Sequence, residues 1–180
     1  TTHRLDIYDE KLAKKQFLDQ LELLYKQNNA TQATLNELPT AYDYIRLGHP
    51  LSCVLEWAVA KLYGLNPDNA ISFSSQTVPV LAILRKNLLD RKNTQILYTG
   101  ELPSSFDAEV LERVYGYKFE LKKIENAEEI SVFDGSTIFV SHQNKIAINN
   151  LNPAIDFFVN LHANLGSMLL VNGEKNEHYI

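Results

Sequence analysis

The sequence predicts an α/β fold with a mainly parallel sheet in three layers, preceded by an N-terminal helix. Short apolar segments alternate with amphipathic segments of helical length. The short segments are rich in Ile, Leu, Val and Phe and alternate little with polar residues, which suits strands covered on both faces. Several expected helices stop at a glycine and lead quickly into an apolar segment, a pattern that is typical of right-handed crossover units.

The first part of the chain, residues 1–43, is expected to hold one helix and a connector. Apolar residues recur at helical spacing across residues 9–27, at Leu12, Phe17, Leu18, Leu21, Leu24 and Tyr25. The polar residues 28–32 are interpreted as the connector. The next helix is predicted over residues 50–63, where Gly64 takes the position that ends helices. The α/β domain is assigned to residues 44–180.

The remaining elements alternate along the chain. The predicted strands are short, and they span residues 70–73, 95–98, 118–124, 137–140 and 168–171. The predicted helices span residues 77–89, 105–115 and 153–165, with a short acidic turn or helix at 126–130. Pro79 falls in the first turn of its helix, where proline is tolerated, and Gly116 and Gly166 end the other two helices.

Length, charge and cysteine content limit the class of protein. The 180 residues suffice for one domain with a proper core, and a net charge of −5 without a Lys/Arg cluster argues against nucleic acid or an anionic membrane as a partner. No apolar run is long enough to span a bilayer, and the N-terminus lacks a signal-peptide profile. Cys53 is the single cysteine, so we expect a reducing, cytoplasmic setting. The chain starts without an initiator methionine, so we expect it to be processed or trimmed.

Polar residues follow the predicted strands. In open α/β sheets the ligand usually lies beyond the carboxyl ends of the strands. Here these positions are residues 74–77, 99–101, 141–144 and 172–174. Any binding site is therefore expected to draw on them.

Two segments carry groups suited to a phosphate-sized anion. Residues 44–51, Tyr-Ile-Arg-Leu-Gly-His-Pro-Leu, place a phenol and a guanidinium two positions apart just before a predicted helix. Residues 72–75, Ser-Phe-Ser-Ser, place hydroxyls where a strand gives way to a helix. A helix N-terminus binds anions through its free backbone N–H groups.

These segments resemble the signatures of the Cys/Met-metabolism (transsulfuration) family of pyridoxal-phosphate enzymes, the fold-type I group that includes cystathionine γ-synthase. That family carries Tyr-x-Arg-x-Gly-Asn-Pro-Thr, then a helix beginning Leu-Glu, then a strand ending in Ser-Ser-Gly-Met. This chain has residues 44–51, then Leu55 and Glu56, then residues 73–77. Residues 111–117 resemble the end of the next helix of the family. The resemblance covers residues 44–171 and implies the first half of a cofactor-binding domain.

The resemblance also implies roles for individual residues. Tyr44 and Arg46 would reach the cofactor phosphate of a neighbouring subunit. Backbone N–H groups at Ser75, Gln76 and Thr77 would hold the phosphate of their own subunit. Asn144 would lie near the ring hydroxyl, and Asn172 would take the position of the family's Asp beside the pyridine nitrogen. No catalytic residue and no metal ligand are assigned.

The chain departs from the family at several of these positions. Gln76 stands where the family has a glycine that allows close backbone approach. Asn172 stands for the Asp, and an amide cannot keep the pyridine nitrogen protonated. The segment after Tyr98 offers no ring-stacking tyrosine, and no lysine is assignable as the Schiff-base lysine, which in the family lies well downstream. We therefore expect the chain alone to bind no pyridoxal phosphate and to be inactive.

The function expected from this combination is assembly or regulation, as a degenerate domain of a cystathionine γ-synthase-like enzyme of sulfur amino-acid metabolism. The expected partner is a second copy of the chain or an adjacent pyridoxal-phosphate enzyme domain, because the Tyr44/Arg46 motif makes sense only when it is presented to another subunit. Two alternatives stay open: a truncated part of a true transsulfuration enzyme, or an unrelated α/β domain that binds a small molecule.

Several residues have a structural interpretation beside the functional one. Arg46 also fits a surface ion pair, and Ser74 and Ser75 are expected to cap the following helix, which is compatible with ligand binding. Cys53 is expected to be a buried, inert thiol. The five histidines show no close metal-ligand spacing; His162 is expected to be packed within a helix, and His142, at a strand end, is the one candidate for a site role.

Overall fold

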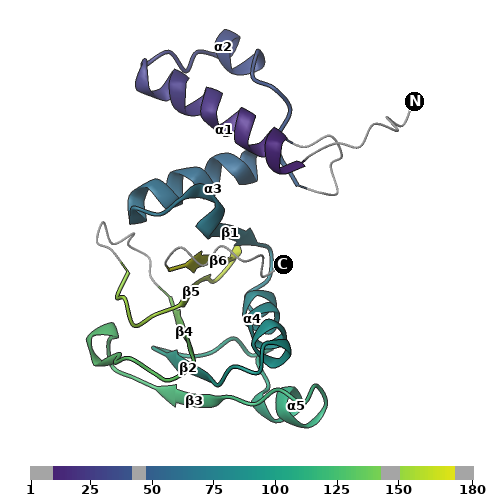
Figure 1. The fold of residues 1–180 in the computed structure, drawn as a ribbon, viewed down its shortest axis with the longest axis vertical. Coiled ribbons are helices and arrows are strands. Elements are labelled where there is room, and N and C mark those ends of the chain that lie inside the picture. Colours follow the sequence, from purple (N-terminus) through teal and green to yellow (C-terminus); the bar gives the residue numbers. More distant parts are fainter. Residues whose placement is uncertain (1–9, 42–47, 143–150, 173–180) are drawn as a thin grey trace. The chain divides into compact units, whose positions relative to one another are not determined.

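The computed structural model describes residues 10–41, 48–142 and 151–172. Within these ranges the chain forms five α-helices, two short 3-10 helices and six strands (Figure 1). It divides into two compact units, residues 1–58 and 59–180, and the boundary falls within helix α3 (Pro50–Tyr63). The boundary expected from the sequence, at residue 43, lies earlier in the chain.

The N-terminal unit has a helical core. Helix α1 (Glu10–Lys26) begins and ends within one residue of the predicted range, and α3 has the predicted bounds. Apolar side chains of these two helices and of the segment before α3 form one cluster: Phe17, Leu18, Leu21, Ala41, Cys53 and Trp57. The Cys53 side chain is fully buried, as expected for an inert thiol.

A short helix, α2 (Gln32–Asn36), follows the predicted connector and was not expected. None of its residues is buried, so local hydrogen bonds rather than packing stabilise it. The Thr34 N–H donates to Thr31 Oγ1 at 3.3 Å, and the Thr31 N–H donates to Thr34 Oγ1 at 3.0 Å. This reciprocal pair is a capping box built from two threonines, a composition less common than Ser/Thr with Glu/Gln.

The second unit contains a six-stranded sheet in the order β1-β6-β5-β4-β2-β3. Its strands are β1 (Ala70–Phe73), β2 (Thr94–Tyr98), β3 (Glu120–Lys123), β4 (Ser136–Ser141), β5 (Phe157–His162) and β6 (Gly166–Val171). The β2/β3, β2/β4 and β4/β5 pairs are parallel, whereas β6 is antiparallel to both of its neighbours. The mainly parallel α/β sheet expected from the sequence is confirmed, with β6 as its exception.

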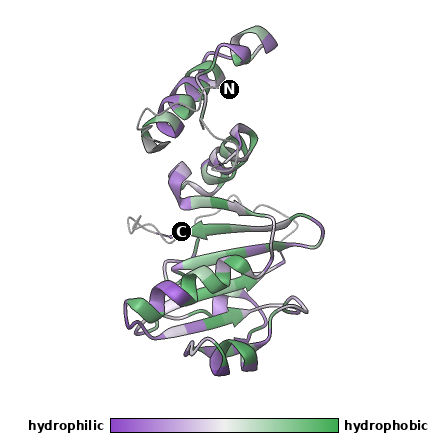
Figure 2. Ribbon diagram, turned by 90° about the vertical axis from the view of Figure 1, so that its right-hand side faces the viewer, coloured by the Kyte–Doolittle hydropathy of each residue, from purple (hydrophilic) through white to green (hydrophobic). Residues whose placement is uncertain are grey.

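Both faces of the sheet are covered. On one face, helices α4 (Val78–Leu89) and α5 (Ala108–Arg113) pack against the sheet through residues such as Ile83 and Leu111. On the other face, the end of α3 and the segments around residues 124–130 and 151–155 form a second cluster. Every residue of β4 is buried, which explains why it shows no polar alternation (Figure 2).

The predicted helix over residues 153–165 is wrong. Residues 157–162 form β5, a short turn follows, and Gly166 begins β6. Phe157, Val159 and Leu161 pack on one face of the sheet and Phe158 on the other. Because both faces are buried, the segment is apolar at nearly every position, and periodicity cannot distinguish such a strand from a buried helix.

Gly166 therefore does not end a helix. Its φ is +89°, and a Cβ at this position would collide with the backbone of Phe73 and Ser74. The glycine thus allows the β5–β6 hairpin to lie directly against the end of β1. Gly64 and Gly116, by contrast, follow α3 and α5 with positive φ, as predicted.

The other differences concern element ends. Helix α5 is shorter than the predicted range of 105–115, and strand β3 is shorter than 118–124. The acidic segment near residue 126 forms a 3-10 helix (Ala127–Glu129), and another one (Pro67–Asn69) precedes β1. None of the helices in the described ranges combines the length and the apolar character needed to cross a membrane.

Candidate functional site

The carboxyl ends of five strands meet at one edge of the sheet. Strand β1 is antiparallel to β6, and β6 is antiparallel to β5, so β1 runs in the same direction as β5, β4, β2 and β3. Residues 74–77, 99–101 and 141–142 therefore lie at this carboxyl edge, as expected. Strand β6 begins there and ends at the opposite, amino edge.

Ser75 and Thr77 lie at the start of α4, where the resemblance implies a phosphate cradle. The Ser75 Oγ accepts hydrogen bonds from the Thr77 N–H at 3.2 Å and from the Val78 N–H at 3.3 Å. Thr77 is the N-cap residue of α4 and forms no side-chain capping bond, so the expectation that Ser74 and Ser75 cap this helix is wrong; Ser75 lies before the cap and accepts the N–H groups of the cap and of the first helical residue. Two backbone donors that could hold an anion are consequently occupied by the chain's own hydroxyl group.

Gln76 is half-buried and joins the same edge to the β5–β6 hairpin. Its side-chain Nε2 donates to the His162 carbonyl at 2.8 Å, and the Ser167 hydroxyl donates to the Ser75 carbonyl at 2.6 Å. These two bonds, with the close approach of Gly166 to Ser74, bind the hairpin to the end of β1. Gln76 thus has a structural role that a glycine could not perform.

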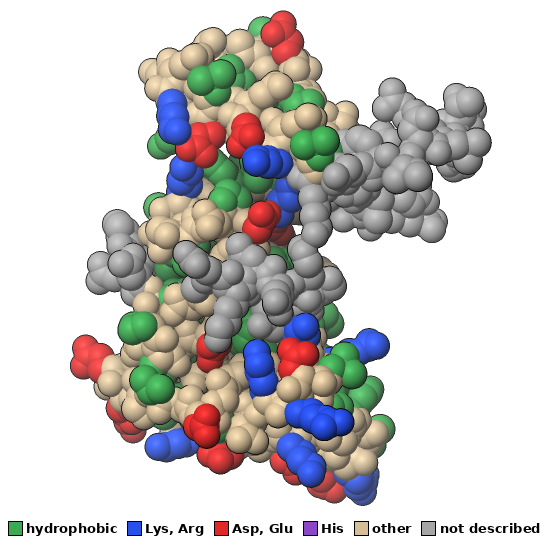
Figure 3. Space-filling view, in the orientation of Figure 1, with side chains coloured by type: hydrophobic (Ala, Val, Ile, Leu, Met, Phe, Trp, Pro, Cys, Tyr) green, Lys and Arg blue, Asp and Glu red, His purple; other side chains and the backbone are tan. Residues whose placement is uncertain are grey.

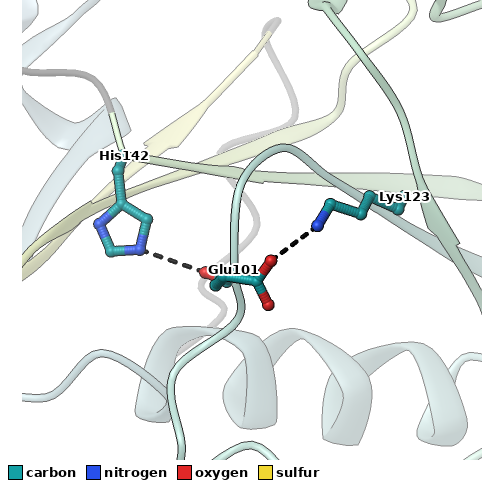
Figure 4. Close-up of polar contacts among 3 residues, drawn as sticks. All are labelled: Glu101, Lys123 and His142. Atoms are coloured by element: carbon teal, nitrogen blue, oxygen red, sulfur yellow. Dashed lines mark hydrogen bonds and ion pairs between the residues drawn. The ribbon is translucent and has the colours of Figure 1, made fainter.

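The next polar group along this edge consists of Glu101, Lys123 and His142 (Figure 4). Lys123 Nζ donates to Glu101 Oε1 at 2.8 Å, and His142 Nε2 lies 3.3 Å from the Glu101 carbonyl oxygen. The hydrogen bond to Lys123 lowers the pKa of the Glu101 carboxyl, and the same bond raises the pKa of the Lys123 ammonium. Both groups are consequently charged near neutral pH.

A further pair lies between β2 and β4. The hydroxyls of Thr99 and Ser141 are 2.7 Å apart and share a hydrogen bond. Ser141 is buried, so this bond satisfies a hydroxyl that would otherwise lose its contact with water. The polar residues of the carboxyl edge are therefore bonded largely to one another.

Asn172 lies at the amino edge, so the expectation that it shares an edge with residues 74–77 is wrong. The cause is the antiparallel direction of β6, which follows from the hairpin that the sequence did not predict. The Asn172 Nδ2 donates to the carbonyls of Asn152 at 3.0 Å and Ile155 at 2.8 Å. Asn172 therefore holds the segment that leads into β5.

The structure thus brings Ser75, Gln76 and Thr77 together and places Asn172 apart from them. Tyr44, Arg46 and Asn144 lie outside the described residues, as do residues 173–174. His162 ends β5 and is exposed, so the expectation of a histidine packed within a helix is wrong. Its Nδ1 accepts the Asn164 N–H at 3.2 Å, which helps to shape the hairpin turn.

Sequence reasoning missed a groove of about 700 Å³ at the amino edge. The residues that line it come from the end of α4 and the turn after it, from the start of β3, and from the segment before β4. The one local signal was the basic pair Arg91–Lys92 in a polar turn, which is common on surfaces and is not specific. Among the described residues no group of three or more His, Cys, Asp or Glu could hold a metal ion.

Comparisons with known proteins add no family assignment. No family model matches the chain, and a search of the curated proteins finds no match.

Proposed function

We propose that this chain is a non-catalytic α/β domain related to the cystathionine γ-synthase-like pyridoxal-phosphate enzymes, and that it serves assembly or regulation in sulfur amino-acid metabolism. The resemblance of residues 44–51 and 73–77 to the family's signatures supports the relationship. The mainly parallel sheet, with β1 leading through Ser75 into α4, is compatible with it.

The observation that carries the non-catalytic part is the bonding of the carboxyl edge. Ser75 Oγ occupies backbone donors at the start of α4, and the Gln76 side chain is bonded to the β5–β6 hairpin. A phosphate at this position would have to displace Ser75 from two hydrogen bonds. Exchanging one set of bonds for another gains little net free energy.

The state of Lys123 also supports the proposal. It ends β3 at the carboxyl edge, about where a ligand of an α/β sheet would lie, yet its amine donates to Glu101 and its pKa is raised. A Schiff base forms from a neutral amine, so catalytic lysines normally have lowered pKa values. Lys123 is therefore a poor candidate for that role.

The assembly part is supported by exposed leucines on α3. Leu51 is 71% exposed and Leu55 is 50% exposed, and they are one helical turn apart. They follow directly after the Tyr44/Arg46 motif, which in the family is offered to a partner subunit. Burying each of these side chains in an interface would contribute about 1.5–3 kcal/mol when complete.

The proposal predicts that the chain forms no internal aldimine. Pyridoxal phosphate is added to the chain, and absorbance in the visible range is measured before and after dialysis and after borohydride treatment. We expect no absorbance that survives dialysis. A stable aldimine would favour the alternative of a true enzyme fragment, and a Schiff-base lysine segment encoded beyond Ile180 would place catalysis elsewhere in the same polypeptide.

Self-association is measured by size-exclusion chromatography with light scattering. We expect a concentration-dependent oligomer that is weakened by Leu51→Gln and Leu55→Gln. Leu89→Gln is the matched control, because Leu89 is also 71% exposed on a helix of the other unit. A chain that stays monomeric at high concentration, or a control variant with the same effect, would contradict docking through α3.

A further inference from the structure

The groove at the amino edge is a concave site whose residues are distant in sequence. It is lined by the end of α4 and the turn after it, by the start of β3 and by the segment before β4, and its charged lining residues are Arg91, Lys92, Lys118, Glu120 and Asp134. Its volume of about 700 Å³ lies within the range of roughly 300–1,000 Å³ that small-molecule sites occupy. It lies entirely within the second unit. It is at the opposite edge of the sheet from residues 75–77, where the resemblance implies a phosphate site.

The walls of the groove are partly aromatic. Phe119 and Phe133 are half-buried and approach it from the start of β3 and from the segment before β4. Gly135 leaves room for the Phe133 ring, because a Cβ at residue 135 would come within 2.7 Å of the ring and would also collide with the Asn93 carbonyl. A larger residue at position 135 would therefore disturb this wall of the groove.

Three cationic side chains line the same groove: Arg91, Lys92 and Lys118. All three are exposed, and none forms an ion pair within 4.0 Å in the part of the chain that the structure describes. Two carboxylates, Glu120 and Asp134, also line the groove, so the cations are in excess by one. Cations without carboxylate partners beside aromatic walls suit an aromatic ligand that carries an anionic group.

The turn that carries Arg91 and Lys92 has a defined conformation. The Lys92 N–H donates to the Asn87 carbonyl at 2.9 Å, and Arg91 adopts a left-handed backbone with φ of 56°. This is the hydrogen bond of a Schellman-type helix end, formed here with arginine at the position that usually favours glycine. The backbone that presents both cations is thus held by the end of α4.

Two buried polar atoms near the groove have no hydrogen-bond partner. Asn87 is 2% exposed; its Nδ2 donates to Thr94 Oγ1 at 2.9 Å, whereas its Oδ1 has no partner. Ser136 Oγ is also without one, and Ser136 lines a recess of about 60 Å³ that shares Lys92 with the groove. Unsatisfied buried polar atoms are rare and costly, so these two mark a weakly bonded part of the amino edge.

We propose that this groove binds a small aromatic phosphate of nucleoside-monophosphate type. The ring lies against Phe119 and Phe133, and the phosphate is bound by Arg91, Lys92 and Lys118. The site is separate from the carboxyl edge, and the proposal does not depend on the relationship to pyridoxal-phosphate enzymes.

The test is a titration of the chain with adenosine monophosphate, compared with adenosine and with inorganic phosphate. Binding is measured by calorimetry and located by amide chemical shifts. We expect saturable binding of adenosine monophosphate that is at least about tenfold tighter than binding of either part, since ring and phosphate contacts add. The shifts are expected at residues 91–94, 118–120 and 133–134, and binding should weaken as salt is raised.

Single substitutions test which side chains contact the ligand. Lys118→Gln and Arg91→Gln lie on different segments, and each is expected to weaken binding about tenfold by removing a charge-assisted contact. Phe133→Leu should weaken binding of adenosine monophosphate by about tenfold and leave phosphate binding unchanged. Arg85→Gln is the matched control, because Arg85 is exposed on α4 and does not line the groove. Circular dichroism checks that each variant folds.

Any of the following results would overturn the proposal. One is the absence of saturable binding at millimolar adenosine monophosphate, and another is equal affinity for inorganic phosphate alone, which would reduce the groove to a non-selective anion contact. The third is an equal loss of affinity in the Arg85→Gln control, or shifts confined to the carboxyl edge.

Discussion

The two edges of the sheet use their polar groups differently. At the carboxyl edge Ser75, Gln76, Thr99 and Glu101 each bond to a group of the same chain. At the amino edge Asn87 Oδ1 and Ser136 Oγ have no partner, and they lie beside the groove and the small recess. Among the described residues, these polar groups at the edge that α/β folds normally use for ligands are bonded within the chain, while two buried polar atoms at the opposite edge are left unsatisfied.

A sequence signature and a ligand site need not involve the same residues. Residues 73–77 resemble a phosphate-binding signature, yet in the structure they bind the β5–β6 hairpin. The groove has no recognisable signature, because its residues come from three segments that only the fold brings together.

The largest effect is expected from Gly166→Ala. A Cβ there meets the backbone of Phe73 and Ser74 at a φ of +89°, so both steric collision and conformational strain oppose it. We expect a loss of at least about 2 kcal/mol in the free energy of unfolding, measured by urea denaturation. Gly116→Ala is the matched control, because its φ is +71° but nothing lies within 4 Å, and it should cost only about 1 kcal/mol. Equal losses of unfolding free energy in the two variants would show that the close contact between the β5–β6 hairpin and the end of β1 adds nothing to the cost.

Asn172→Asp tests whether this residue belongs to a cofactor site or to the amino edge. The substitution restores the residue type of the family, but it replaces an amide donor to two carbonyls with a carboxylate that faces them. We expect a loss of about 2 kcal/mol in unfolding free energy at neutral pH, and a smaller loss at acid pH, where the carboxyl is protonated. Tighter binding of pyridoxal phosphate without destabilisation would contradict the structural role.

Two serines at opposite edges allow a direct comparison. Ser75→Ala removes the hydroxyl that accepts two N–H groups at the start of α4 and should cost about 1 kcal/mol, seen as a lower midpoint of thermal unfolding. Ser136→Ala removes a buried hydroxyl that has no partner, so stability should be unchanged or rise by up to about 1 kcal/mol. An equal loss of stability in the two variants would contradict the difference in hydrogen bonding between the two edges.

The smallest effect concerns the exposed Glu101–Lys123 pair. Because the pKa of Glu101 is lowered in the folded state, its contribution to stability is present above the unfolded pKa and is lost as pH falls through the folded pKa. An NMR titration of the carboxyl carbon should give a midpoint below that of an isolated Glu. In Lys123→Met the midpoint should rise toward the ordinary value. An unchanged midpoint in the variant would show that Lys123 is not the cause.

Much of the fold follows from local patterns. The amphipathic spacing of α1, the glycines after α3 and α5, and Pro79 at the start of α4 act within a few residues, so the sequence predicts these elements well. The prediction for residues 157–162 is wrong because burial on both faces of β5 leaves no hydrophobic periodicity that would distinguish a strand from a helix. The predicted position of Asn172 is wrong for the same reason. Because residues 157–162 form a strand and not part of a helix, β6 runs in the opposite direction to the one expected.

The amino-acid sequence is sufficient to predict the α/β class and most helices and strands, because these depend on propensity and on hydrogen bonds between near neighbours. The antiparallel direction of β6, the edge at which Asn172 lies, and the groove lined by Asn87, Lys118 and Phe133 emerge in the folded chain alone. These depend on pairing and packing between residues far apart in the chain. Such contacts form through burial of the whole sheet, and no short stretch of sequence encodes them.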